Sequence, residues 1–344
     1  MAKQTSAKKI TKKTTKKNTA QPNQTLAEQE KELKKMIAEN DSVELKFAWQ
    51  EINPLYVKEL KKLAKNLKLK GFRKGCAPPE LAAKEISPEK VVDAVLRRVL
   101  PKAYEKTIKE GNYTPLSDPE FQAISLNKDN DWIIKASFAQ KPKFTLGNWK
   151  KVVDQAKKKA LQEIEKHNKK ITAETQLKKA STTKQTNTKT RSQPRPQAQQ
   201  PLSPQQQKEA IIQAVLGSLA EQIKPAIPLL LIQQNTRQEL DNFLKQLKQL
   251  NVKLEEFLKA RNMTQDQLTM EMFLQSLNKL QVEFIINAIA EQEKIKAEDK
   301  DVEARIKTIE DEDTKKKVEQ DMQYQSYLRA VIAKQKVLDF LVQD

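Results

Sequence analysis

The chain has 344 residues and a formal net charge of +19, from 64 lysines and arginines against 45 aspartates and glutamates. Its one cysteine and one histidine exclude an internal disulfide, His/Cys metal clusters and Cys–His catalysis. The sequence has no Gly-rich phosphate loop and no membrane-length apolar run. We therefore expect a cytoplasmic protein with no cofactor, no metal and no catalytic residue.

The positive charge is concentrated in two stretches of low complexity. Residues 1–20 carry seven lysines and no acidic residue, and residues 150–200 carry a net charge of +10. Because such sequences cannot bury a core, we predict a disordered basic tail over residues 1–25. Two interpretations of this tail stay open: a polycation attracted to RNA, or a solubilising extension without a specific role.

The first ordered elements are predicted to be a helix, a strand and a second helix. Residues 26–39 read as a helix. Apolar and polar residues then alternate from Val43 to Gln50, which predicts a half-buried strand. An amphipathic pattern with i, i+3, i+4, i+7 spacing follows, and we expect this second helix to begin near Pro54.

The most informative segment is the loop GFRKG at residues 71–75. Gly71 and Gly75 are two of only five glycines in the chain, which indicates sharp turns on both sides of the loop. Between them, Phe72 is offered to a partner, and Arg73 and Lys74 are offered to anionic oxygens such as phosphates. The alternative is an ordinary basic turn between two helices.

After this loop the pattern predicts a helix and two strands. Ser87, Pro88 and Glu89 read as an N-cap, a first-turn proline and a first-turn acid, and the helix extends to about residue 110. Strands are predicted at residues 121–126 and 132–138, joined by a polar turn. The order strand, helix, loop, helix, strand, strand predicts a small α+β domain with the loop at one end.

This domain resembles the ribosome-binding domain of the trigger factor family, bacterial chaperones that meet nascent chains at the ribosomal exit tunnel. The resemblance lies in GFRKG with a proline three residues on, EISPEKVVDAVL, PLSDPEF and KPKFTLGNWK. It implies a ribosome-binding domain over residues 26–149, in which Phe72, Arg73 and Lys74 contact rRNA and an exit-tunnel protein of the large subunit. Cys76 stands where the family commonly has a further lysine, so one phosphate contact lacks its cation here.

The middle of the chain, residues 150–202, is predicted to be a charged helix followed by a flexible linker. The helix is predicted from about residue 148 to 179, with apolar residues at every fourth position from Val152 to Ile164, and a Thr-, Lys-, Gln- and Pro-rich stretch follows. In the trigger factor family this interval holds a β-rich prolyl isomerase domain. Here no glycine occurs between Gly147 and Gly217. The resemblance therefore implies that the isomerase domain is absent and that the chain is not an enzyme.

Residues 203–344 are predicted to form a helical domain. The sequence indicates a helix capped by Ser203 and Pro204, a long helix after Pro228, a short one at residues 252–261 and a long one opened by a capping box from Thr264 to Gln267. A last helix contains residues 324–341. The segments IKPAIPLLLIQQNTRQELDNFLKQL, LEEFLKARNMTQDQL and AIAEQEKI resemble the C-terminal domain of trigger factor.

The predicted fold is thus an α+β N-terminal ribosome-binding domain joined by a flexible linker to an all-α C-terminal chaperone domain. The resemblance implies an ATP-independent chaperone that docks at the ribosome and shields nascent or unfolded polypeptides, with no membrane partner. Four methionines in the helical region suit a surface that accepts unrelated chains: Met263, Met270, Met272 and Met322. A ribosome- or RNA-binding assembly factor without client-holding activity is the alternative. A weak homodimer stays open.

Overall fold

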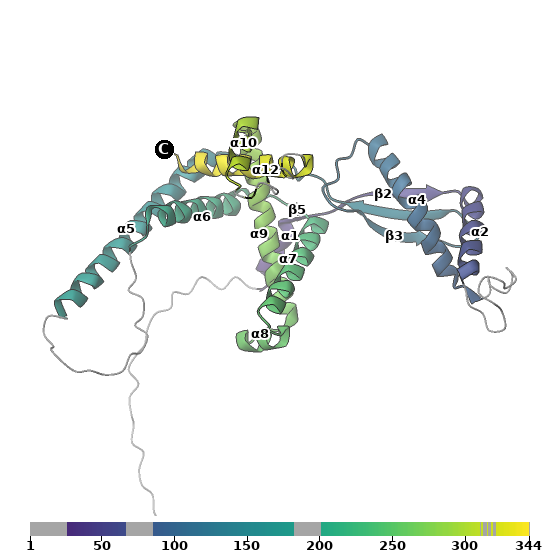
Figure 1. Ribbon diagram of the computed structural model, residues 1–344, viewed down its shortest axis with the longest axis horizontal. Coiled ribbons are helices and arrows are strands. Elements are labelled where there is room, and N and C mark those ends of the chain that lie inside the picture. The colour runs from purple at the N-terminus through teal and green to yellow at the C-terminus, as the bar shows by residue number, and fades with distance from the viewer. Residues whose placement is uncertain are drawn as a thin grey trace, which may run out of the picture. The chain divides into compact units, whose positions relative to one another are not determined.

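The computed structural model describes residues 26–66, 85–181, 201–309, 311, 315, 318 and 321–343 (Figure 1). The predicted basic tail, the GFRKG loop and most of the predicted linker lie outside these residues. Within them the chain is mostly helical and contains a small sheet. None of the described helices combines the length and the apolar character that crossing a membrane would require.

The first element is helix α1 (Leu26–Lys35), which belongs to a different compact unit from residues 36–344. The prediction of a helix here is confirmed, but its predicted end near Glu39 is wrong. Ile37–Ala38 instead form the short strand β1, which pairs in parallel with β5 (Ile227–Pro228). Backbone pairing with a strand so far along the chain overrides the local helical pattern.

The sheet has three antiparallel strands in the order β2 (Asp41–Phe47), β4 (Trp132–Phe138) and β3 (Glu120–Ser125). The strands predicted at residues 121–126 and 132–138 are both confirmed, the first of them one residue earlier than predicted. Side chains of β4 alternate strictly between buried and half-buried, because successive residues of a strand point to opposite faces. Trp132, Ile134, Ala136 and Phe138 form the buried face, so β4 is the central strand in burial as well as in order.

Two long helices accompany this sheet, α2 (Trp49–Asn66) and α4 (Pro88–Glu110). Ile52 of α2, Val95 of α4 and Trp132 of β4 are buried in one cluster, so the two helices and the sheet share a core (Figure 1). The predicted start of α2 near Pro54 is wrong, and Trp49 belongs to the helix and not to the strand. The reason is a cap from outside the segment: the Trp49 backbone N–H donates to Asp131 Oδ1 at 2.9 Å.

The helix α4 confirms the predicted span and the N-cap position of Ser87, although this cap makes no side-chain hydrogen bond. Ser87 takes the N-cap position without a side-chain hydrogen bond to the helix, and Pro88 occupies the first helical position. Proline there supplies a φ angle suited to the helix and lacks an N–H that would otherwise need a partner. The helix therefore starts where predicted through its proline and not through its serine.

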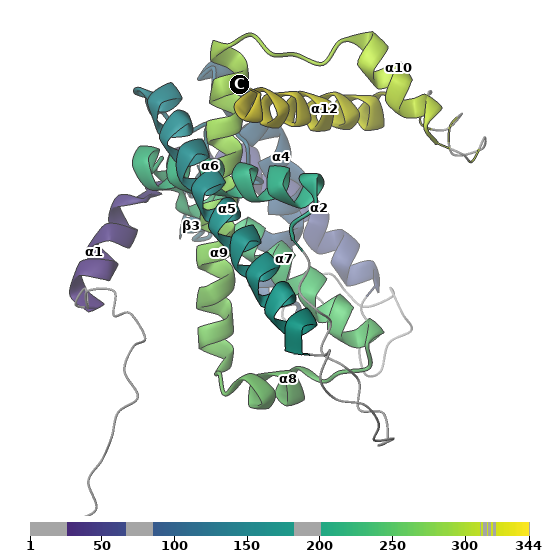
Figure 2. The same ribbon diagram turned by 90° about the vertical axis from the view of Figure 1, so that its left-hand side faces the viewer.

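Helix α5 (Trp149–Ser181) packs along α6 (Pro204–Ile223), as Figures 1 and 2 both show. The predicted cap at Ser203 and Pro204 is confirmed, and Gln206 completes a capping box: Ser203 Oγ accepts from the Gln206 N–H, and Gln206 Oε1 accepts from the Ser203 N–H. A single core joins α5, α6, α9 and α12, and contains Trp149, Val153, Ala156, Val215, Leu219, Ile285, Ile286, Ile289, Val337 and Leu341. The first half of α5 is thus built into the helical part of the protein.

The remaining helices are α7 (Leu229–Gln249), α8 (Leu254–Arg261), α9 (Gln265–Gln292), α10 (Asp299–Lys307) and α12 (Met322–Val342). The predicted capping box at Thr264 and Gln267 is confirmed at the start of α9. The helices α7 and α9 pack on each other, with α8 joining their ends (Figure 2). Helix α10 and strand β5 were not predicted, so the segment 203–344 is not purely helical.

Two contacts hold the start of α7. The Leu230 N–H donates to Asn40 Oδ1 at 2.8 Å, so a residue between β1 and β2 caps this helix. Gln281 of α9 is buried, and its Nε2 donates to the Pro225 carbonyl at 3.0 Å. A buried amide of this kind satisfies a backbone oxygen that has no helical partner. Both bonds fix the turn between α6 and α7.

Candidate interaction surfaces

The predicted docking residues Gly71, Phe72, Arg73, Lys74 and Gly75 lie outside the described part of the chain, and their assignment stays a prediction. The structure does describe both flanking helices. The helix α2 ends at Asn66, α4 begins at Pro88, and the two pack on each other. The segment that carries the predicted loop therefore connects two helices that share a core.

The contact between these helices includes a buried carboxylate. Glu59 of α2 is 9% exposed, and its Oε1 lies 2.8 Å from Lys62 Nζ and 3.2 Å from Arg98 Nη1 of α4. The hydrogen bond from Lys62 lowers the pKa of Glu59 most, opposed by burial and aided by Arg98. The carboxylate thus stays ionised and joins α2 to α4 near the middle of both helices.

Exposed apolar side chains gather on the segment formed by α7, α8 and α9. Leu250, in the connection between α7 and α8, is 72% exposed, and Met270 of α9 is 53% exposed. Phe243 and Phe257 pack edge to face with ring centroids 5.0 Å apart, which fixes α8 on α7. We name the exposed set the helical-tip group, and it consists of Leu244, Leu250, Val252, Met270 and Leu274.

A second exposed apolar surface lies on α12. Tyr324, Tyr327 and Val331 follow one another at spacings of three and four residues, so they share one face of the helix. Tyr327 is 62% exposed, and its ring centroid lies 6.0 Å from that of Tyr324. We name these three residues the α12 face. Leu328, Val337 and Leu341 of the same helix are buried, so only part of the apolar surface of the helix is covered.

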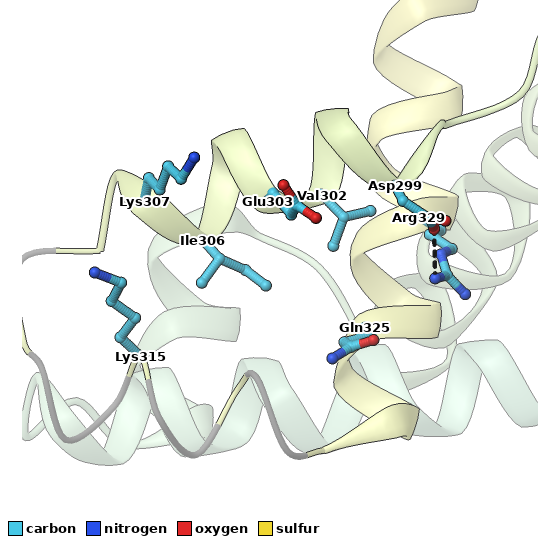
Figure 3. Close-up of a pocket in the computed structure, with 8 residues that line it drawn as sticks. All are labelled: Asp299, Val302, Glu303, Ile306, Lys307, Lys315, Gln325 and Arg329. Atoms are coloured by element: carbon cyan, nitrogen blue, oxygen red, sulfur yellow. Dashed lines mark hydrogen bonds and ion pairs between the residues drawn. The ribbon is translucent and has the colours of Figure 1, made fainter.

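A pocket of about 600 Å³ lies between α10 and α12. Val302 and Ile306 supply apolar surface, and Arg329 of α12 reaches across to Asp299 of α10, with Nη2 2.8 Å from Oδ1 (Figure 3). Charges of both signs surround the apolar floor, from Asp299, Glu303, Lys307 and Arg329. Such a lining suits an amphipathic segment of chain.

Two of the four predicted methionines are largely exposed: Met270 at 53% and Met322 at 83%. Met263 and Met272 are half-buried. The tyrosines of the α12 face and Leu250 were not singled out as surface residues from the sequence. Their signal was an apolar pattern wider than one stripe, which does not say which side of the helix is covered. No group of three metal-ligating side chains occurs among the described residues.

These features define a class of protein with a small α+β part followed by packed helices that expose apolar side chains. Residues 28–176 match the family described as "Bacterial trigger factor protein (TF)", and residues 182–343 match "Bacterial trigger factor protein (TF) C-terminus". The chain belongs to the trigger factor family. Only residues 177–181 separate the two matched segments, which leaves no room for an interposed isomerase domain, as predicted.

Curated relatives support this assignment over part of the chain. The trigger factor of Levilactobacillus brevis is 35% identical over 117 residues, which cover 33% of this chain and 26% of that protein. The trigger factor of Streptococcus pneumoniae (strain Hungary19A-6) is 33% identical over 100 residues, which cover 29% of this chain and 23% of that protein. The chain thus aligns with about a quarter of the length of these relatives.

A solved structure extends the likeness to nearly the whole chain. It comes from work titled "Promiscuous Substrate Recognition in Folding and Assembly Activities of the Trigger Factor Chaperone". The TM-score is 0.52 at 13% sequence identity, and the match covers 89% of this chain and 97% of that chain. The two proteins therefore share a fold.

Proposed function

We propose that this protein is an ATP-independent chaperone that docks on the large ribosomal subunit and holds nascent or unfolded polypeptides in the cytoplasm. The observation that carries the proposal is the pair of exposed apolar surfaces, the helical-tip group and the α12 face. Apolar side chains exposed in groups favour contact with apolar segments of other chains. The family membership and the likeness to a chaperone with promiscuous substrate recognition support the same function.

The chemistry of these surfaces fits weak and unselective binding. Methionine has a flexible, polarisable side chain, and tyrosine offers a broad apolar ring with a polar tip, so both adapt to different partners. Weak contacts of this kind release a client by dissociation alone, which needs no nucleotide. Client binding on the helices and ribosome docking by Phe72, Arg73 and Lys74 then take place on different parts of the chain.

The client-binding part is tested by making the exposed surfaces polar. A variant with Leu250→Gln, Met270→Gln, Tyr324→Gln and Tyr327→Gln should require at least about twofold more protein to suppress aggregation of a denatured client without ATP. The matched control changes Gln246, Gln275 and Gln323, which are exposed on α7, α9 and α12, to alanine. Equal protection by the parent and both variants would remove these surfaces from the proposal.

Ribosome docking is tested separately. Replacing Phe72, Arg73 and Lys74 together with alanine should abolish co-sedimentation with ribosomes, because the contact depends on these side chains. A control with Lys253→Ala and Lys259→Ala also removes two positive charges, from the N-cap and the last turn of α8. It should sediment like the parent. Circular dichroism checks that all variants stay folded. Unchanged sedimentation of the triple variant contradicts the docking assignment.

The alternative is a ribosome- or RNA-binding assembly factor that holds no client. The basic charge of the chain is the observation in its favour. The two functions differ in the client assay, because an assembly factor has no reason to suppress aggregation. Ribosome binding by the parent without protection of any client would favour this alternative.

A further inference from the structure

The exposed side of α5 carries a row of lysines. With 3.6 residues per turn, six of its lysines fall within about a third of the helix circumference. They lie on the side away from the buried residues Val153, Ala156 and Ala160. Because each residue rises 1.5 Å, the row is about 28 Å long. We name it the lysine stripe, and it consists of Lys151, Lys158, Lys159, Lys166, Lys169 and Lys170, all exposed.

Acidic residues neutralise this stripe only in part, because the exposed Asp154, Glu163 and Glu165 lie beside it and not within it. Between residues 151 and 170 the same sector of the helix contains only Gln155, Gln162 and Val152 besides the lysines. Lys169 pairs with Glu165 at 3.5 Å, whereas the other five lysines have no ion pair among the described residues. The exposed charges of α5 therefore leave a net positive surface along several helical turns.

The helix α4 of the same protein shows the usual arrangement for comparison. Its exposed face has three pairs of opposite charge four residues apart: Arg97 with Asp93, Lys106 with Glu110, and Lys109 with Glu105. Such pairs stabilise a helix slightly, whereas like charges at this spacing destabilise it. Lys166 and Lys170 have that unfavourable spacing in α5. Of the stripe lysines, only Lys169 makes a favourable ion pair of this kind among the described residues, so helix stability does not explain the row as a whole.

We propose that the lysine stripe of α5 binds the phosphate backbone of RNA, without preference for sequence. A repeated row of point charges matches a polymer with regularly repeated anionic groups, and lysine binds phosphate as a point charge. No aromatic or amide side chain is placed to read bases apart from Gln155 and Gln162. This contact needs neither the ribosome nor a client, and so goes beyond the proposed docking.

A membrane surface is the less suitable partner. A helix that lies on a bilayer inserts an apolar face beside its basic one. The apolar face of α5 is instead buried in the core with α6, and Leu161 is the only large apolar side chain that its described residues expose strongly. Only electrostatic attraction remains, and an extended RNA backbone places phosphates along the whole stripe.

The test measures binding of the full chain to fluorescent poly(U) RNA of about 20 nucleotides by anisotropy over a range of salt concentrations. The stripe variant changes Lys151, Lys158, Lys159, Lys166 and Lys170 to glutamine, which keeps a good helix former at each site. At about 0.1 M salt its affinity should fall at least tenfold, and the slope of log affinity against log salt should flatten by about 3.

The matched control removes five exposed lysines from elsewhere, by changing Lys245, Lys248, Lys253, Lys259 and Lys300 to glutamine. It should lose less than about threefold in affinity, because its net charge falls equally but the stripe is intact. A variant with arginine at the five stripe positions should bind RNA at least as well as the parent. It also shows that substitution at these sites is compatible with folding.

Three outcomes would overturn the proposal. The first is an equal loss of affinity in both glutamine variants, which would make the attraction a matter of net charge. The second is the absence of RNA binding by the parent. The third is stripe-dependent binding to phosphatidylserine vesicles with no stripe-dependent binding to RNA. The alanine variant of Phe72, Arg73 and Lys74 should keep its poly(U) affinity within about threefold, so failure of ribosome docking is distinguishable from failure of the stripe.

Discussion

At the scale of single residues, Glu59 has the clearest physical role among the described ionisable groups. It is nearly buried, and cations from α2 and α4 donate to the same carboxylate oxygen. A buried charge is tolerated only where partners replace the lost water. Removing the charge leaves Lys62 and Arg98 without their common anion, at the contact between the helices that flank the predicted docking loop.

The substitution Glu59→Gln should therefore lower the free energy of unfolding at pH 7 by about 1–2 kcal/mol. Folding lowers the pKa of Glu59 below its ordinary value of 4.5, so its stabilisation is complete above that pH. It is lost as the pH falls through the folded-state pKa. Urea unfolding of both proteins at pH 7 and in acid should show the difference between them shrinking in acid.

Glu105 provides the control for this prediction. Its pKa is also lowered, by the hydrogen bond from Lys109, but both side chains are largely exposed. Water and salt screen such a pair, so Glu105→Gln should change stability little at any pH. A difference for Glu59→Gln that is independent of pH would show that its charge does not contribute.

At this scale, sequence patterns predict local hydrogen-bonded motifs better than they predict which side chains are exposed. Ser203 with Gln206 and Thr264 with Gln267 are capping boxes in the sequence and in the structure, because their partners lie three residues apart. The exposure of Leu250 and Tyr327 is not encoded in that local way. It depends on which neighbouring helix covers which side, and the apolar pattern is the same for a covered and an uncovered face.

At the scale of elements, two helices begin where distant residues cap them. Asp131, in the turn between β3 and β4, accepts from the first residue of α2 across 82 positions of sequence. Asn40 does the same for the second residue of α7 across 190 positions. The helix starts are therefore tertiary features. This explains why Pro54 was a misleading signal for the start of α2, although it is the right kind of residue for a first turn.

The substitution Asp131→Ala should lower the free energy of unfolding by about 1 kcal/mol, the usual cost of removing an N-cap. The loss should be local, so amide hydrogens in the first turn of α2 should exchange faster than those near its middle. Hydrogen exchange measured by NMR or mass spectrometry checks this. Asp129→Asn in the same turn is the control, since asparagine also tolerates the positive φ of that residue. Equal exchange in the two variants would show that Asp131 does not hold the helix.

Strands and helices with regular patterns could be predicted, whereas the shortest elements could not. The alternation in β4 is complete over seven residues, and its predicted bounds are those observed. The strands β1 and β5 have two residues each and exist only because they pair with each other. Two residues carry no periodicity, so nothing in either segment alone indicates a strand.

At the scale of the whole molecule, the absence of room for an isomerase domain gives a prediction about activity. The protein should not accelerate the slow, proline-limited refolding of a test substrate when present at substoichiometric amounts. It should nevertheless reduce aggregation of a denatured client at near-stoichiometric amounts without ATP. A known prolyl isomerase in the same refolding assay is the positive control. Catalysis by this protein would contradict the absence of an isomerase domain. Failure to protect any client would favour the assembly-factor alternative.

The resemblance in sequence was sufficient to predict the family and the order of its two matched parts. The division into segments 1–25, 26–149, 150–202 and 203–344 stays a prediction. Even so, Trp149, Val153 and Ala156 pack in one core with residues beyond position 210. The charged surface of α5 hides this role in the sequence, because lysines outnumber the small apolar residues that reach the core.

The parallel pairing of β1 with β5 has a consequence for the synthesis of the protein. Ile37 meets Ile227, so the first strand leaves the ribosome long before its partner has been translated. At about 5–20 residues per second, the delay is roughly 10–40 s. During that interval the Met36 carbonyl lacks the Ile227 N–H, from which it accepts a hydrogen bond in the folded protein. Each new copy of this protein is thus itself an incomplete nascent chain, with the same need for protection that we propose it supplies to others.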